Sequence, residues 1–333
     1  MKTLPPIKKF LSFQKRLVIQ KTEDIFLYQW HISFKKENRM KIIDAHNHPD
    51  WLGHNLDRFL KNMETNGIEK TWLLSWESPR YESDKNIEKF ISGPIFGGSN
   101  VSLPFSRCLA YAERAPEKFI LGYCPDPRNP YACDQLRAAH SIYGVKVCGE
   151  CKFRTMYNSP DCLRLFRTAG ELGMPVTLHF DYDFQIHSDD PRGEWWGGTI
   201  DTLEDMLKKC PETIFLGHAP GFWLHIADDG LWEKVRYPQA EGNPVLKEGR
   251  IQELLRKHPN LYCDISAGSG RSALKRDIPH AIRFLTEFQD RIVYARDCFD
   301  NGHQEFLNSL SLPESILEKI YYKNAESLLK KGE

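Results

Sequence analysis

Long hydrophobic runs are missing from this sequence of 333 residues. No apolar stretch approaches the ~20 residues that cross a bilayer, and the N-terminus lacks an apolar segment followed by a small-residue cleavage site. Net charge is missing as well, because 45 Lys and Arg residues balance 45 Asp and Glu residues. This balance gives no electrostatic reason to expect nucleic acid or an anionic membrane as a partner. We therefore expect a cytoplasmic protein with a small-molecule substrate.

Paired cysteines at zinc-finger spacing are also absent. The nine cysteines are an odd number spread through expected strands and helices, which is typical of reduced thiols rather than a disulfide framework. One Cys-x-x-Cys pair, Cys148 and Cys151, lacks the second Cys or His pair that a structural zinc site needs. We interpret the cysteines as core residues in a reducing compartment.

The first forty residues differ in charge from the rest of the chain. They carry nine Lys and Arg residues against three Asp and Glu residues, whereas residues 41–333 carry 36 against 42. A basic arm that binds nucleic acid would need a repeat of aromatic and basic residues, and none occurs. We expect one domain over residues 40–333, preceded by a short N-terminal extension, residues 1–39, that need not belong to the native domain.

Short apolar runs alternate with amphipathic segments from residue 41 onward, the pattern of repeated βα units. A doubly wound sheet is the alternative, but no Gly-x-Gly-x-x-Gly turn follows the first strand. Eight units in about 290 residues predict a single-domain α/β fold, the (β/α)8 or TIM barrel. The expected strands are 41–46, 70–75, 119–123, 143–149, 175–180, 213–218, 260–265 and 291–297. The expected helices are 55–66, 105–115, 130–140, 160–172, 200–210, 246–257, 276–289 and 314–330.

Several expected strands end in a residue that binds metals. His46 and His48 close the first strand, and alternation along a strand points both the same way. His179, His218 and Asp297 close the fifth, sixth and eighth strands. Because the carboxyl ends of barrel strands meet at one rim, we expect these five side chains to converge there.

The region from Met40 onward resembles the amidohydrolase superfamily, in particular the amidohydrolase-related branch that includes aminocarboxymuconate-semialdehyde decarboxylase. The similar segments, in chain order, are IIDAHNH, GVKV, ELGMPVTLH, TIFLGHAPG, VYARD and KIYYKNAESLL. The resemblance implies a metal-dependent TIM-barrel enzyme with one divalent ion. It also leaves a homodimer open.

Carried over position by position, the resemblance makes His46, His48, His179 and Asp297 the metal ligands. It makes His218 a catalytic residue, and Asp297 shares in the proton transfer. Imidazoles with one carboxylate suit Zn²⁺, and Mn²⁺ or Fe²⁺ accept the same donors. On the fourth strand, Glu150 is a candidate ligand bridging to a second metal.

Candidates for substrate binding follow other strand ends. Arg154, Arg192 and Arg271 have guanidinium groups that suit a carboxylate, and surface ion pairs are the alternative for each. Trp195 lies in the long loop after the fifth strand, where it would line the pocket or pack on the barrel.

Three functions remain open at this stage. The first is hydrolysis of an amide, lactone or ester by metal-activated water. The second is decarboxylation of an unsaturated or aromatic acid, but His218-Ala-Pro-Gly departs from the glycine-rich turn of decarboxylating relatives. The third is a catalytically silent barrel that binds a ligand. We favour hydrolysis.

Overall fold

The structure is a computed structural model that describes residues 40–79, 82, 101–182, 195–235, 237, 238 and 243–330. The expected extension, residues 1–39, and the candidate Arg192 lie outside these residues. The chain from Lys41 onward forms one compact unit, and its elements are described by themselves below. No helix of the described residues is long and apolar enough to cross a membrane.

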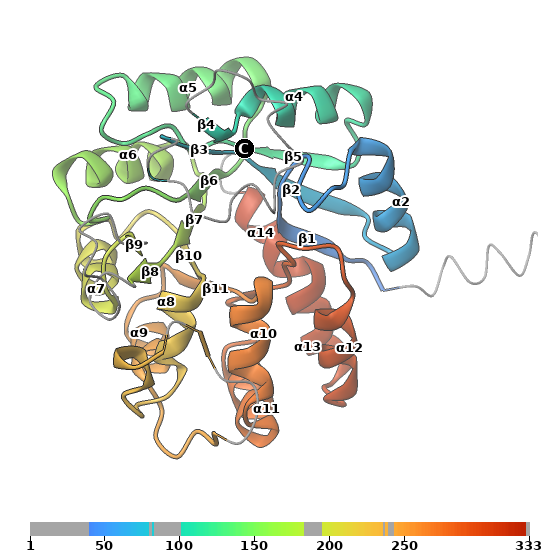
Figure 1. The fold of residues 1–333 in the computed structure, drawn as a ribbon, viewed down its shortest axis with the longest axis vertical. Coiled ribbons are helices and arrows are strands. Elements are labelled where there is room, and N and C mark those ends of the chain that lie inside the picture. Colours follow the sequence, from blue (N-terminus) through green and yellow to red (C-terminus); the bar gives the residue numbers. More distant parts are fainter. Residues whose placement is uncertain are drawn as a thin grey trace, which may run out of the picture. The chain divides into compact units, whose positions relative to one another are not determined.

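Eight parallel strands form the centre of this unit (Figure 1). Hydrogen bonding joins them in two groups, β1-β2-β5 and β6-β7-β10-β11-β12. The strands are β1 (Ile43–Asn47), β2 (Lys70–Leu74), β5 (Phe119–Gly122), β6 (Cys148–Cys151), β7 (Val176–His179), β10 (Phe215–His218), β11 (Leu261–Asp264) and β12 (Ile292–Val293).

Backbone hydrogen bonds join the two groups at both ends. Tyr123 N donates to Val147 O over 2.9 Å, which connects the β5 segment to the β6 segment. Ala45 N donates to Tyr294 O over 3.0 Å, which connects β1 to the segment that follows β12. The strands therefore close into a ring, and the predicted (β/α)8 barrel is confirmed.

Helices follow the strands and surround them in Figure 1. The helices are α2 (Leu56–Asn66), α4 (Phe105–Arg114), α5 (Ala132–Tyr143), α6 (Pro160–Glu171), α7 (Ile200–Lys209), α8 (Pro220–Trp223), α9 (Arg250–Lys257), α10 (Ala267–Lys275), α11 (Ile278–Glu287), α12 (Gly302–Ser309), α13 (Glu314–Glu318) and α14 (Asn324–Leu329). Capping residues determine where a helix begins and ends, as in α2. The Asn55 side chain caps its first turn, and Gly67 ends it in a left-handed conformation.

Two short hairpins extend from the barrel. β3 (Trp76–Pro79) follows β2 and pairs with β4 (Val101–Leu103). β8 (Asp181–Tyr182) follows β7 and pairs with β9 (Trp195–Trp196). Both hairpins come after the carboxyl end of a barrel strand, so they belong to the face that carries active sites in this fold.

The predicted elements differ from the structure at a few places. The fourth strand was expected over 143–149, but β6 begins at Cys148 and continues to Cys151. Helices α10 and α12 were not predicted, because each is short and has no long amphipathic pattern. The last expected helix, 314–330, contains one turn of π-helix, Lys319–Lys323, between α13 and α14.

The barrel interior is apolar below the carboxyl ends of the strands. Trp72 of β2 and Leu216 of β10 belong to one buried cluster, although β2 and β10 lie on opposite sides of the ring. The cluster therefore extends across the inside of the barrel. Ala325 and Leu328 of α14 join the same cluster, so the last helix completes the core.

A buried ion pair joins the start of β1 to the segment that follows β12. Arg296 Nε donates to Asp44 Oδ2 over 2.8 Å, and Arg296 N donates to Asp44 Oδ1 over 2.9 Å. Both side chains are fully buried. Arg296 Nη1 also donates to Asn62 Oδ1 of α2, so the pair links three segments of the chain.

We predict that Arg296→Met destabilises the barrel by about 3–5 kcal/mol, because the substitution leaves the Asp44 carboxylate buried without its counter-ion. Urea unfolding followed by circular dichroism measures the change. Lys61→Met is the control, since Lys61 pairs with Glu64 on the exposed face of α2 and its loss should leave the midpoint unchanged. Equal midpoints for the two variants would contradict the prediction.

Candidate metal centre

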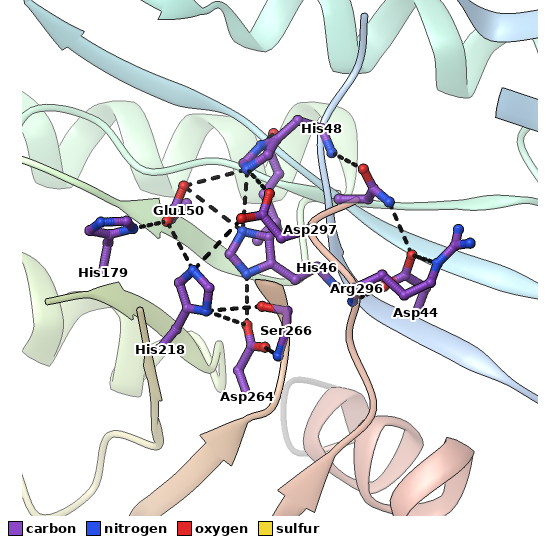
Figure 2. A network of polar contacts seen from close by, with 12 residues as sticks. Asp44, His46, His48, Glu150, His179, His218, Asp264, Ser266, Arg296 and Asp297 are labelled. Carbon is purple, nitrogen blue, oxygen red and sulfur yellow. Dashed lines mark hydrogen bonds and ion pairs between the residues drawn. The ribbon is translucent and has the colours of Figure 1, made fainter. Parts of the chain in front are cut away.

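Polar side chains from the carboxyl ends of several barrel strands converge at one place (Figure 2). All are buried except Asp297, which is partly exposed. The set consists of His46 in β1 and His48 just after it, Glu150 in β6, His179 at the end of β7, His218 at the end of β10, Asp264 at the end of β11, and Asp297 after β12. Strand closure therefore brings together all five residues that were singled out at strand ends, together with Glu150.

His46 and His48 present their Nε2 atoms to the same point, 3.2 Å apart. His48 Nδ1 lies 2.9 Å from Leu74 O, and a carbonyl oxygen only accepts, so Nδ1 carries the proton and Nε2 carries the lone pair. His46 Nδ1 lies 2.7 Å from Asp264 Oδ2 and is oriented in the same way. These partners fix each ring with its free nitrogen toward the centre, as a metal ligand requires.

Glu150 lies between two groups of histidines. Its Oε2 atom is 3.4 Å from His48 Nε2 and 3.8 Å from His46 Nε2. Its Oε1 atom is 2.8 Å from His179 Nδ1 and 3.8 Å from His218 Nε2. One carboxylate thus faces His46 and His48 with one oxygen and His179 and His218 with the other (Figure 2).

Asp297 completes the group on the side of His48. Its Oδ1 atom is 3.6 Å from His48 Nε2, and its Oδ2 atom is 3.9 Å from His218 Nε2. Within the described residues, Oδ1 is buried and has no hydrogen-bond partner. The backbone is held with a φ of 50° while Asp297 N donates to His46 O and Trp51 Nε1 donates to Asp297 O. A buried carboxylate oxygen without a donor fits a cation ligand.

Asp264 and Ser266 were missed by the sequence analysis. Asp264 Oδ2 orients His46 and lies 3.8 Å from His218 Nδ1, and Ser266 Oγ lies 2.9 Å from the same nitrogen. Asp264 ends the seventh barrel strand, so the rule that singled out the other strand ends could have found it. Ser266 carries no such signal.

Negative charge exceeds positive charge in this cluster. Burial opposes protonation of His46, but Asp264 and then Glu150 and Asp297 outweigh it and raise the pKa of His46 to about 10, so that without a cation Nε2 keeps a proton, which a metal ion would displace on binding. Burial also opposes ionisation of Glu150, but hydrogen bonds from His179 and His48 hold its pKa well below the ordinary value. Glu150 is therefore ionised, and its buried negative charge favours a cation.

The other two imidazoles are neutral. Burial, with the nearby charge of Lys152, lowers the pKa of His179 well below its usual value, and burial lowers the pKa of His218. Neutral imidazole is the form that binds a metal.

The donor set fits a divalent metal ion. Three overlapping groups each have ligand atoms within 4.8 Å of one another: His46, His48 and Glu150; His46, His218 and Asp297; and Glu150, His179 and His218. Two nitrogens bound to one Zn²⁺ at about 2.0–2.1 Å lie about 3.3 Å apart at tetrahedral angles, close to the spacing of the His46 and His48 nitrogens. His179, predicted as a ligand beside His46 and His48, lies in the group with Glu150 and His218, and Glu150 also belongs to the group of His46 and His48.

The predicted substrate-binding residues lie in different surroundings. Arg154 follows β6, and its guanidinium carbon is 5.4 Å from the centroid of the Trp196 ring. Trp195 lies in β9, paired with Tyr182, and the neighbouring Trp196 is the one whose ring lies 5.7 Å from that of His179. Arg271 on α10 pairs with the exposed Asp300 over 2.8 Å, so it forms the surface ion pair given as its alternative.

Comparison with known proteins gives one family and many solved structures. The family model described as Amidohydrolase matches residues 105–331. No curated protein matches the chain. An uncharacterised TIM-barrel protein from Bordetella bronchiseptica is 15% identical, with a TM-score of 0.57 over 88% of this chain and 99% of that one.

Two further structures are decarboxylases. The 2,6-dihydroxybenzoate decarboxylase from Rhizobium is 16% identical, with a TM-score of 0.55 over 88% of this chain and 99% of that one. A dihydroxybenzoic acid decarboxylase from Polaromonas, solved with manganese and the inhibitor 2-nitroresorcinol, is 16% identical, with a TM-score of 0.56 over 89% of this chain and 98% of that one. At this identity the likeness supports the barrel fold.

We predict that Asp264→Asn weakens the affinity for Zn²⁺ by about 10- to 100-fold, because Asp264 orients His46 without being grouped among the ligand atoms. Competition with a zinc-binding dye measures the affinity. The control is Asp290→Asn, which removes an exposed carboxylate that pairs with Lys319. An unchanged affinity in Asp264→Asn would show that the hydrogen bond to His46 does not matter for metal binding.

Proposed function

The chain belongs to the amidohydrolase family of metal-dependent enzymes, and from this premise we propose that it hydrolyses a C–N or C–O bond of a small molecule. The bond is that of an amide, a lactone or an ester. One observation carries the proposal: the two oxygens of Glu150 face two separate pairs of histidines. A bridging carboxylate of this kind suits a pair of cations, an arrangement found in enzymes that activate water.

In this proposal the residues divide into two ligand groups. His46, His48, Asp297 and one oxygen of Glu150 would hold the first divalent cation, and His179, His218 and the other oxygen of Glu150 would hold a second. Zn²⁺ is the preferred ion for nitrogen and carboxylate donors, with Mn²⁺ and Fe²⁺ as alternatives. Such a cation lowers the pKa of water toward neutrality and polarises a carbonyl oxygen.

The side chains of the protein itself transfer the proton of the attacking water. With Asp297 Oδ1, which has no hydrogen-bond donor among the described residues, on the cation, Oδ2 is left to accept the proton of an attacking water and deliver it to the leaving group. His218, expected above to be catalytic, is in this arrangement a ligand of the second cation. Ser266 lies against the Nδ1 atom of His218. The Nε2 atom of His218 lies within 3.9 Å of both Glu150 and Asp297.

Decarboxylation is the second candidate function, because several structural neighbours are decarboxylases of aromatic acids. Besides those above, they include a 5-carboxyvanillate decarboxylase from Sphingomonas paucimobilis. Another neighbour, from Pseudomonas putida, has been provisionally assigned as a 2-pyrone-4,6-dicarboxylic acid hydrolase. The structural neighbours thus include proteins assigned to each of the two reactions, decarboxylation and hydrolysis. A catalytically silent barrel is the third candidate, and the buried, ionised Glu150 among histidines counts against it.

We predict that the wild-type protein binds two divalent cations per chain, and that Glu150→Gln loses most of both because the neutral amide cannot bridge them. Inductively coupled plasma mass spectrometry of zinc-loaded, desalted protein measures the content. Glu171→Gln, an exposed carboxylate paired with Arg137, should keep both ions. A single ion per chain in wild type would remove the second cation from the proposal, and metal content in Glu150→Gln equal to wild type would refute the bridging role.

We predict that the zinc-loaded protein hydrolyses a member of a panel of lactones, amides and esters and releases no CO₂ from aromatic acids. Asp297→Asn should lower kcat by at least about 100-fold, since general acid–base groups contribute about 10²- to 10⁴-fold. Liquid chromatography and a CO₂ assay measure the products, and the metal content of the variant is measured alongside. Asp300→Asn is the control on the exposed side of the same loop. Release of CO₂ without hydrolysis would establish the second candidate instead.

A further inference from the structure

Lys152 is a buried lysine next to the candidate metal centre. It follows Glu150 by two residues, beyond the carboxyl end of β6, and only 9% of its surface is exposed. Its Nζ atom lies 3.9 Å from the centroid of the Trp76 ring and 4.8 Å from that of the Trp196 ring. The ammonium group is thus enclosed by two indoles.

No carboxylate balances this charge within the part of the chain that the structure describes. Lys152 Nζ forms cation–π contacts with the two indoles, and neither an ion pair nor a hydrogen bond of this atom occurs among the described residues. A buried ammonium normally needs a counter-ion and hydrogen-bond acceptors, and aromatic faces replace only part of its lost hydration. The site around Lys152 therefore lacks one anionic group.

The neighbouring indoles add donors rather than acceptors. Trp76 Nε1 and Trp196 Nε1 are both buried and have no hydrogen-bond partner among the described residues. An indole nitrogen only donates. The indole nitrogens therefore offer the ammonium group no acceptor, and an anion such as a carboxylate is the partner that Lys152 lacks among the described residues.

An arc of rings connects Lys152 to both sides of the candidate metal centre. From one side, the ring of Trp51 is 5.4 Å from that of His48 and 6.5 Å from that of Trp76. From the other side, the Trp196 ring is 5.7 Å from that of His179. Lys152 lies between Trp76 and Trp196, so it is in the middle of a wall that begins and ends at candidate metal ligands.

We propose that Lys152 determines specificity by binding a carboxylate of the substrate, at a distance from the bond that reacts. The inference rests on the proposed function and narrows it to substrates that carry an anionic group besides the amide, lactone or ester. The ammonium group supplies a charge-assisted hydrogen bond, and the indoles of Trp76 and Trp196 exclude water from it. Lys152 takes no part in proton transfer.

The test uses probes that bind the metal at one end and offer a carboxylate at the other. The probes are the monohydroxamates of succinic, glutaric and adipic acid, and each is compared with its neutral methyl ester. The hydroxamate end binds the metal in both compounds, so only the carboxylate distinguishes them. Isothermal titration calorimetry measures the affinities of the zinc-loaded wild type, Lys152→Met, Lys152→Arg and Lys146→Met. Lys146 is the matched control, a lysine that precedes the opposite end of β6.

In wild type, we expect the carboxylate of at least one chain length to bind at least about tenfold more tightly than its methyl ester. Lys152→Met should reduce this preference to within about twofold and leave the affinity for the methyl ester unchanged. Lys152→Arg should restore a preference, and Lys146→Met should keep it. No preference at any length in wild type, or a preference that survives in Lys152→Met, would overturn the inference.

Metal content and methyl-ester binding separate this result from the proposed function. If both are retained while the carboxylate preference is absent, the metal centre stands and the role of Lys152 is wrong. If wild type holds no metal and binds no methyl ester, the metal-dependent function fails, and the inference that rests on it fails with it.

Discussion

The hydrogen bond from Asp297 N to His46 O, 2.9 Å long, joins the last barrel segment to the first. Ala45 N donates a similar hydrogen bond to Tyr294 O, nearer the start of β1. The buried pair of Asp44 and Arg296 joins the same two segments. Without this seam the strands would form an open sheet whose edges lie apart. Because the seam closes the ring, a carboxylate from near the end of the chain comes within 3.6 Å of a histidine from its beginning.

Around this seam, three of the four imidazoles are held by groups other than the bridging Glu150. Leu74 O orients His48, Asp264 orients His46, and Ser266 lies against His218. Each of these contacts uses one nitrogen of an imidazole and leaves the other for the centre. Glu150 then joins the two sides, so that four imidazoles and three carboxylates share one buried volume (Figure 2).

Much of this arrangement could be predicted from the sequence, because it depends on strand ends. His46, His48, His179, His218 and Asp297 were all identified as the last residues of apolar runs, and barrel closure does bring strand ends together. The sharing of histidines between ligand groups could not be predicted, since it depends on which oxygen of Glu150 faces which ring. Lys152 was passed over because the sequence does not show that two tryptophans from distant hairpins enclose it. The short helices α10 and α12 were missed because tertiary packing, rather than a long amphipathic pattern, stabilises them.

The position of α14 has a consequence for the order in which the chain assembles. Its Ala325 and Leu328 belong to the same apolar cluster as Ile43 and Ala45 of the first strand. During synthesis, the first strand must therefore wait for partners that leave the ribosome almost three hundred residues later, and contacts of such large sequence separation form slowly. Until then the inner face of β1 lacks its final covering, and the nascent barrel is an open arc with uncovered apolar surface, the kind of species in which aggregation begins.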